Sequence, residues 1–135
     1  MGLPPRFARR FRFLRLLQLS LLAGALYDAA FALLLVARPQ LPARWLDLPL
    51  PGERFYLWVL ATLLLMLAAL YLEAARDPRR YSAVVAVAIG GRLLGSLALL
   101  AAALPRPDLA GLLPLSAVDG AFGLCHAVLW WPIRS

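Results

Sequence analysis

The sequence predicts an all-α fold, an integral membrane four-helix bundle with both termini in the cytoplasm. Of its 135 residues, 63% are hydrophobic and only 16% are charged, and its mean hydropathy is +0.78. A soluble domain is about half apolar and about a quarter charged, so a soluble chain of this size would leave much apolar surface in water. Four apolar runs approach the ~20 residues that cross ~30 Å of hydrocarbon as a helix. Backbone groups in lipid must satisfy their own hydrogen bonds, which favours helices.

The four predicted helices form one transmembrane domain that covers residues 1–135. They span about 14–37, 55–73, 81–104 and 109–133. The connection from Arg38 to Arg54 contains four prolines and a glycine, so neither flanking helix continues through it. Its middle, PARWLDL, is expected to form one turn at the interface, with Trp45 at the level of the headgroups.

Two aspartates mark the expected starts of the third and fourth helices. Asp77 is a suitable N-cap and Pro78 a suitable first helical residue, so the third helix is expected to start there, just before its apolar run. Asp108 is expected to cap the fourth helix in the same way.

Arginines set the expected orientation, because the cytoplasmic side of a membrane protein carries the excess of basic residues. One side of the predicted bundle carries nine arginines and the other side carries four. The nine are Arg6, Arg9, Arg10, Arg12, Arg15, Arg76, Arg79, Arg80 and Arg134, and the four are Arg38, Arg44, Arg54 and Arg106. The basic N-terminus is expected to anchor the chain at the inner leaflet. A cleaved signal is disfavoured, because the apolar run is too long and contains Asp28.

Three ionisable residues lie inside apolar runs, where each costs roughly 2.5–3.5 kcal/mol on insertion scales. They are Asp28, Arg92 and Asp119. A rise of 1.5 Å per residue places them about 13, 18 and 15 Å below the outer surface, so the three charges can meet near the midplane. A guanidinium at that depth needs a partner, and a carboxylate offers it two hydrogen bonds.

Further polar residues can extend this cluster into a stripe. Ser96 lies four residues from Arg92 on the same helix face, and Thr62 falls at a similar depth. Tyr27 is a weaker candidate for a hydroxyl in this stripe, because it points about 100° away from its neighbour Asp28. His126 follows Asp119 by two helical turns on one face. The stripe is expected to lock the order of the helices or to form a ligand or proton site, unless the charges reach water at the membrane surface.

The sequence predicts no metal site, no cofactor and no nucleic-acid binding. Cys125 and His126 are adjacent, so they point about 100° apart, and no second pair of ligands exists. No polar helix carries a basic face interleaved with aromatic residues, and no nucleophile–base–orienter set occurs. The segment GGRLLG lacks the preceding strand of a dinucleotide fingerprint. Gly91 and Gly95 form instead a G-x-x-x-G step that indicates close helix packing.

A second charged group lies at the predicted cytoplasmic ends of the second and third helices. Tyr71, Glu73 and Asp77 lie there with three arginines that are candidates for binding a lipid headgroup, namely Arg76, Arg79 and Arg80. The alternative is a solvated hairpin whose charges neutralise each other.

The segments YLEAARDPRRY, GGRLLG and DGAFGL resemble a pattern in small four-helix bacterial membrane proteins. The overall layout is similar to DoxX-like proteins and more remotely to the EXPERA group of sterol isomerases and sterol-binding receptors. These resemblances imply a multi-pass protein of the bacterial inner (plasma) membrane. The EXPERA likeness implies membrane-embedded acids that bind or protonate a lipophilic substrate, with Asp28 and Asp119 as candidates. The DoxX likeness implies an accessory membrane subunit of a redox system.

Three functional hypotheses follow. The first is a non-enzymatic membrane protein that binds a lipophilic ligand at the midplane cluster or serves as an accessory subunit of a larger membrane complex. The second is an isomerase or quinone-linked enzyme that uses Asp28, Asp119 or His126 as an acid or base. The third is a transporter or proton path, which four short helices would form only as an oligomer. The expected partners are membrane lipids, a lipophilic small molecule or quinone, and a protein partner or a second copy.

Overall fold

The computed structural model describes residues 5–134, without the side chains of residues 5–8, and these residues form helices and loops only. The helices are α1 (Pro5–Ala37), α2 (Gln40–Trp45), α3 (Arg54–Arg76), α4 (Ser82–Ala103), the short 3-10 helix η1 (Pro107–Leu109) and α5 (Leu112–Trp130). Four of them, α1, α3, α4 and α5, are long and apolar enough to cross a membrane. The predicted all-α four-helix bundle of a multi-pass membrane protein is therefore confirmed.

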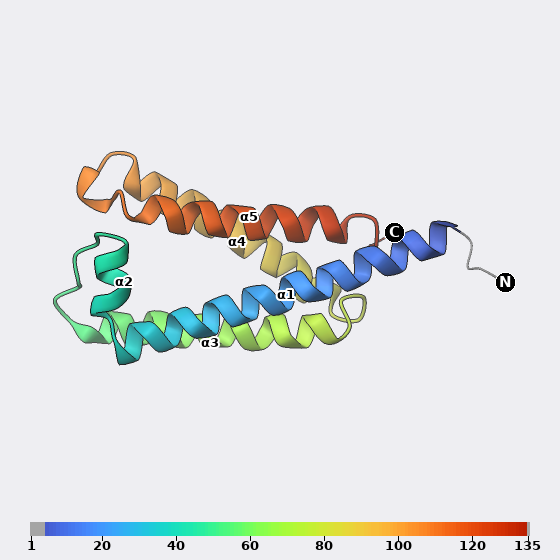
Figure 1. Ribbon diagram of the computed structural model, residues 1–135, viewed down its shortest axis with the longest axis horizontal. Helices are drawn as coiled ribbons and strands as arrows, with labels where there is room; N and C mark the ends of the chain where they lie inside the picture. The colour runs from blue at the N-terminus through green and yellow to red at the C-terminus, as the bar shows by residue number, and fades with distance from the viewer. Residues whose placement is uncertain (1–4, 135) are drawn as a thin grey trace.

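The four long helices pack as two pairs. In Figure 1, α1 runs along α3 and α5 runs along α4, while α2 lies between the pairs at the end of the molecule opposite the termini. The described ends of the chain lie at the same end of the bundle, as an even number of spans requires. The short helix α2 forms within the predicted interfacial segment, and Trp45 at its end is exposed.

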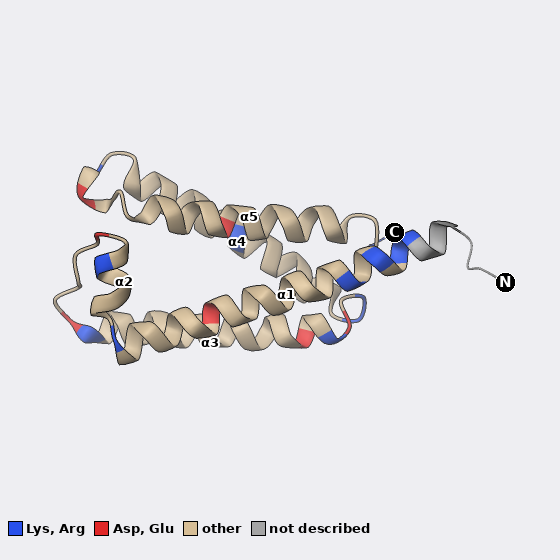
Figure 2. Cartoon of the chain, in the orientation of Figure 1, with Lys and Arg blue, Asp and Glu red and all other residues tan. Residues whose placement is uncertain are grey.

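Helix α1 is longer than predicted, because it begins at Pro5 rather than near residue 14. Proline is tolerated in the first turn of a helix, and no further proline or glycine interrupts the chain before Gly24. The basic residues Arg9, Arg12 and Arg15 therefore lie on the extension of a membrane helix rather than in a loop (Figure 2). The side chain of Arg6 lies outside the described residues.

The prediction that the third long helix starts at Asp77 and Pro78 is wrong, because α4 begins at Ser82. The Asp77 carboxylate accepts hydrogen bonds from the backbone N–H groups of Arg79 and Arg80, both at 3.1 Å. Asp77 therefore caps a tight turn that reverses the chain between α3 and α4. Helical geometry is reached only after Tyr81, whose φ of −98° and ψ of 34° lie outside the helical region.

Asp108 does not cap the fourth long helix either. It lies in η1, and its carboxylate accepts a hydrogen bond of 2.7 Å from Arg106. This hydrogen bond holds the pKa of the Asp108 carboxyl below its usual range. Helix α5 begins at Leu112, after Gly111, where a Cβ atom would collide with the carbonyl of Leu46. The close approach of the segment after α2 thus sets where α5 begins, which no local signal in the sequence shows.

At its other end, α5 stops at Trp130 rather than at residue 133. The backbone N–H groups of Ile133 and Arg134 both donate to the Trp130 carbonyl, at 2.9 and 3.2 Å, so the last residues form a turn. Ile133 is buried in a cluster with Leu17 and Leu21 of α1, which fixes this turn against the bundle.

Helices α4 and α5 approach each other closely, and of the predicted G-x-x-x-G step only Gly95 lies at the contact, where a Cβ atom would lie 3.3 Å from Asp119 Oδ2. A Cβ atom at Gly91 would meet nothing within 4 Å. On α5, a Cβ at Gly120 would lie 2.9 Å from the Ser96 hydroxyl, and one at Gly123 would lie 2.8 Å from the Leu93 side chain. The close contact therefore involves Gly95 of α4 and both of these α5 glycines, and Gly91 takes no part in it.

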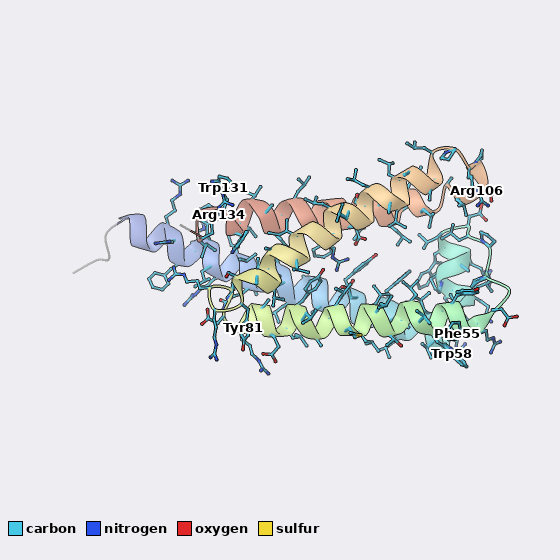
Figure 3. The ribbon with its side chains drawn as sticks, turned by 180° about the vertical axis from the view of Figure 1, so that it is seen from behind. Phe55, Trp58, Tyr81, Arg106, Trp131 and Arg134 are labelled. Carbon is cyan, nitrogen blue, oxygen red and sulfur yellow. The ribbon has the colours of Figure 1, made fainter. Side chains whose placement is uncertain are left out.

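Charged and exposed aromatic residues lie near the two ends of the molecule, and apolar side chains cover the part between them. Figure 2 shows basic residues at both ends of the molecule, at the start of α1 and the turn between α3 and α4 and also around α2, and few charges along the middle of the helices. Figure 3 shows Phe55 and Trp58 at the α2 end and Trp131 at the opposite end. Exposed tryptophans at two levels, with apolar side chains exposed between them, are typical of a lipid-facing surface.

Candidate functional site

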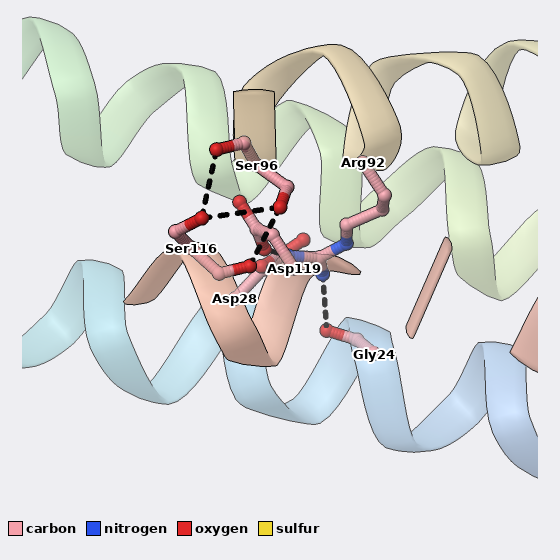
Figure 4. Close-up of polar contacts among 6 residues, drawn as sticks. All are labelled: Gly24, Asp28, Arg92, Ser96, Ser116 and Asp119. Atoms are coloured by element: carbon pink, nitrogen blue, oxygen red, sulfur yellow. Dashed lines mark hydrogen bonds and ion pairs between the residues drawn. The ribbon is translucent and has the colours of Figure 1, made fainter. Parts of the chain in front are cut away.

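Arg92 of α4 lies in the middle of the bundle with only 5% of its surface exposed. One of its terminal nitrogens donates to the Asp28 carboxylate of α1 at 2.7 Å. The other donates to the Asp119 carboxylate of α5. The predicted cluster of Asp28, Arg92 and Asp119 is thus present, and it joins three helices (Figure 4).

Three aromatic rings surround the Arg92 guanidinium. Its central carbon lies 5.7 Å from the ring centroid of Tyr27, 5.3 Å from that of Tyr71 and 5.2 Å from that of Phe122. Cation–π attraction at such distances offsets part of the cost of burying a charge. Tyr71 was expected at the charged end of α3, yet it is buried with 2% of its surface exposed. It lies six residues before Asp77, which is about 9 Å along the helix.

Ser96 lies beside the charged cluster and forms a symmetric contact with Ser116 of α5. Each hydroxyl donates to the other residue's backbone carbonyl at 2.8 Å, and the two hydroxyl oxygens lie 3.2 Å apart (Figure 4). Ser116 was not predicted as a site residue, although it lies three residues before Asp119 and shares its helix face. The pair ties α4 to α5 and satisfies both hydroxyls, so it serves packing.

Thr62 does not belong to the cluster. It is exposed, and its hydroxyl donates to the Trp58 carbonyl one turn earlier at 2.8 Å. The expectation from depth alone was wrong, because depth does not say which face of α3 a residue occupies. A threonine bonded to its own helix satisfies its hydroxyl without any partner helix.

His126 lies on the predicted interior face and is completely buried. Its ring centroid lies 6.2 Å from that of Tyr71 and 5.9 Å from that of Phe122. No hydrogen bond of good geometry reaches either ring nitrogen within residues 5–134, although the backbone of Ser20 faces the ring. His126 therefore packs behind the aromatic rings that surround Arg92, and it does not contribute to the wall of any cavity described below.

A cavity of about 140 Å³ borders the charged cluster on the side of α2. Its polar wall consists of Asp28, Arg92 and Asp119. The rest of its wall consists of apolar and aromatic side chains from four helices, namely Tyr27, Phe31, Leu60, Leu64, Leu99 and Leu115. A small apolar pocket with a few convergent polar groups is the usual form of a ligand site.

Two apolar grooves adjoin this cavity at the α2 end. They measure about 200 and 340 Å³. Both share Phe31 and Leu115 with the cavity, and both are roofed by Pro42 and Leu46 at the α2 segment. The cleft, by which we mean the cavity and these two grooves, runs from the charged cluster to the α2 end of the bundle.

The charges around the cavity do not balance. The cluster carries two carboxylates and one guanidinium, and one oxygen of Asp28, Oδ2, is buried without a hydrogen-bond partner among the described residues. Arg92 Nε is likewise buried and unpartnered there. A buried polar atom without a partner costs about 1–3 kcal/mol, so the structure retains unused hydrogen-bonding capacity beside an apolar cavity.

The three candidate headgroup arginines have different surroundings. Arg76 pairs with Glu73 at 2.8 Å and is exposed. The guanidinium of Arg80 lies 5.7 Å from the ring centroid of Tyr81. Only Arg79 lines a cavity, one that opens at the end of the molecule.

Metal ligands do not gather anywhere in the described part of the chain, where no group of three His, Cys, Asp or Glu residues is close enough to hold an ion. Cys125 is exposed, and the Ser20 hydroxyl lies 3.5 Å from its sulfur.

A comparison of the chain with protein-family models, with curated proteins and with solved structures finds no match.

Proposed function

We propose that this protein binds a lipid-soluble amphiphile in the cleft, with the polar end of the ligand at Asp28 and Asp119. The observation that supports the proposal is the cavity of about 140 Å³ with three charged groups on one wall and leucine and aromatic side chains on the others. Intramembrane ionisable residues are by default candidates for a functional site. Here they border a hollow rather than a filled core.

The charge of the cluster selects the polar end of the ligand. The one guanidinium is already paired with both carboxylates, and Asp119, whose side chain is 22% exposed, is the acceptor that a ligand in the cavity can reach. A ligand that donates a hydrogen bond, such as an alcohol or an amine, complements this acceptor. An acidic ligand would add negative charge to a cluster that already carries an excess of it. The favoured class is therefore a long-chain or polycyclic alcohol or amine.

The apolar grooves supply space for the body of such a ligand. The cavity alone is small, since drug-sized ligands occupy pockets of about 300–1,000 Å³. The adjoining grooves of about 200 and 340 Å³ bring the whole cleft into that range. The segment around α2 lines both grooves, which open at this end of the bundle. The ligand therefore enters from the membrane at the α2 end.

We further propose that the arginine-rich end faces the cytoplasm and that the membrane is a bacterial inner membrane. The excess of arginines on the side of the termini supports this orientation. The cleft then opens toward the outer leaflet.

A second candidate function, an acid–base enzyme acting on the bound amphiphile, uses the same geometry. It is favoured by a carboxyl group, Asp119, that borders an apolar cavity with 22% of its side chain exposed. Such a group is suited to move a proton to or from a substrate. His126 is not part of this candidate, because it does not reach the cavity. The two functions differ in whether the bound molecule leaves the protein chemically changed.

Native mass spectrometry of protein purified in a mild detergent tests the first function. The wild type is expected to carry an additional mass that fits an alcohol or amine lipid. Leu115→Trp fills the cleft, because Leu115 borders the cavity and both grooves, and it should abolish the additional mass. The matched control is Leu124→Trp on the exposed face of the same helix, which should retain it.

Two results would count against binding in the cleft. One is a wild type that carries no ligand and takes up none of a long-chain alcohol or amine added before purification. The other is equal loss of the ligand in Leu115→Trp and Leu124→Trp.

A further inference from the structure

A pocket of about 630 Å³ lies at the end of the molecule where the chain begins and ends. Its wall comes from α1, from the start of α4 with the turn before it, and from the end of the chain. The lining residues are Arg10, Arg79, Ser82, Trp130, Ile133 and Arg134. This pocket is far from the midplane cluster along the helices and shares no residue with the cleft.

The charge of this pocket has one sign. Three of its six lining residues are arginines and none is acidic. The nearest acid in sequence, Asp77, already accepts hydrogen bonds from two backbone N–H groups of the turn. Arginines from three separate segments therefore converge, and no carboxylate of the described residues lies in the wall, so the pocket has a positive potential that attracts an anion. Arg79 and Arg134 are exposed, and Arg10 is partly buried.

Arg10 is held in place by the fold rather than extended into solvent. One of its terminal nitrogens donates to the carbonyl of Ile133 at 3.3 Å. Its Nε atom is buried and has no hydrogen-bond partner among the described residues. Ile133 is itself buried in the core cluster, so the guanidinium has a fixed position.

Two further features suit a phosphate group. Ser82 is the first residue of α4, and the N-terminus of a helix attracts anions through its free N–H groups. The Arg134 guanidinium lies 3.4 Å from the centroid of the Trp131 ring, and Figure 3 shows both at this end of the bundle. A tryptophan at such an end is typical of the headgroup level of a membrane.

We propose that this pocket binds the phosphate of an anionic phospholipid headgroup, with Arg10, Arg79 and Arg134 as its ligands. Guanidinium groups bind phosphate through paired hydrogen bonds, and each basic residue near an anionic surface contributes about 1 kcal/mol. The position between the tryptophan level and the arginine-rich end favours a lipid as the source of the phosphate. The site is independent of the amphiphile in the cleft.

The test is a lipid titration on the full-length protein in phosphatidylcholine nanodiscs. Increasing fractions of phosphatidylglycerol are expected to raise Tm, since a ligand that binds only the folded state stabilises it. Arg10→Gln and Arg134→Gln should each weaken the apparent lipid affinity by about fivefold. Arg12→Gln is the matched control, because Arg12 lies at the same end with the same charge but is exposed and outside the pocket. Its titration should follow the wild type.

A second arm distinguishes a lipid from a free anion. Inorganic phosphate added to protein in phosphatidylcholine alone should leave Tm unchanged. If phosphate alone gives the full stabilisation, the assignment to a lipid is wrong. If Arg12→Gln loses as much affinity as Arg10→Gln, or if phosphatidylglycerol has no effect on the wild type, the pocket is not a headgroup site. The wild-type titration remains decisive even where a variant fails to fold.

Discussion

A guanidinium buried in a membrane bundle needs its counter-charges within reach, and Arg92 has them on α1 and α5. Depth along each helix was enough to predict the trio of Asp28, Arg92 and Asp119, because a charge in an apolar run is rare and needs a partner. The aromatic rings around Arg92 could not be predicted in this way. Tyr71 and Phe122 fit anywhere in an apolar helix, so their positions carry no signal until the helices are placed.

Removing Arg92 alone should destabilise the bundle more than removing the whole cluster. Arg92→Leu leaves Asp28 and Asp119 unpaired, and breaking a buried ion pair from one side costs about 3–5 kcal/mol. The triple variant Asp28→Leu, Arg92→Leu, Asp119→Leu leaves no unpaired charge and should cost less. Unfolding midpoints in denaturing detergent compare the two, with exposed Arg44→Leu as the control. An unchanged midpoint for Arg92→Leu would show that the three groups do not pair.

His126 should be replaceable by an apolar residue. No hydrogen bond of good geometry reaches its two ring nitrogens among the described residues, and its neighbours are the rings of Tyr71 and Phe122. His126→Phe therefore removes unsatisfied polar atoms, whose cost is about 1–3 kcal/mol, and should keep or raise Tm. Thermal unfolding and ligand retention by native mass spectrometry check this. A loss of bound ligand in a folded His126→Phe protein would give the imidazole a role in the site.

At the scale of the helices, the close packing of α4 on α5 determines where Arg92 can reach Asp119. The sequence predicted close packing from the small-residue step of Gly91 and Gly95, of which only Gly95 faces α5, and it did not predict the contacts of Gly120 and Gly123. A pair of glycines indicates that two helix backbones can approach closely. Which face of the helix makes the contact depends on where the neighbouring helix lies. For the same reason the starts of α4 and α5 differ from the prediction, since a turn and a neighbouring carbonyl set them.

A glycine-to-alanine substitution should therefore destabilise the bundle at Gly123, which lies at the helix contact, but not at Gly91, which does not. Gly123→Ala places a Cβ within 2.8 Å of the Leu93 side chain and 3.2 Å of the Arg92 Cβ atom, so the Leu93 side chain or α4 itself must shift. Overpacking of this kind costs about 1–3 kcal/mol. Gly91→Ala on α4 meets open space and should be tolerated. Equal unfolding midpoints for both variants would contradict the close contact.

The whole molecule consists of two helix pairs with α2 between them, and most of its charges lie at the ends of the helices. The number of helices, their class and the shared side of the termini were predictable from hydropathy and spacing. The cleft was not, because its walls are leucines and aromatics that the sequence cannot distinguish from lipid-facing ones. Only the placement of α2 and of Phe31 and Leu115 shows that these side chains leave a hollow beside the charges.

The orientation has a direct test in intact bacterial cells. In a Cys125→Ala background, Arg12→Cys should resist a membrane-impermeant maleimide, because the arginine-rich end is expected inside. Arg106→Cys, in the exposed loop at the opposite end, should be labelled. Permeabilised cells provide the control, since both positions should then react. Labelling of Arg12→Cys alone in intact cells would show that the protein has the opposite orientation in the membrane.

The most direct test of the central claim is photocrosslinking with a long-chain amine that carries a diazirine on its chain. We expect the label, mapped by peptide mass spectrometry, on the cleft residues Phe31, Leu99 and Leu115, and competition by an unlabelled long-chain alcohol. Asp28→Asn should weaken the labelling, because it reduces the negative charge at the polar end of the cleft. Labelling confined to lipid-facing residues such as Leu94 and Leu124, without competition, would contradict the binding of an amphiphile at the charged cluster.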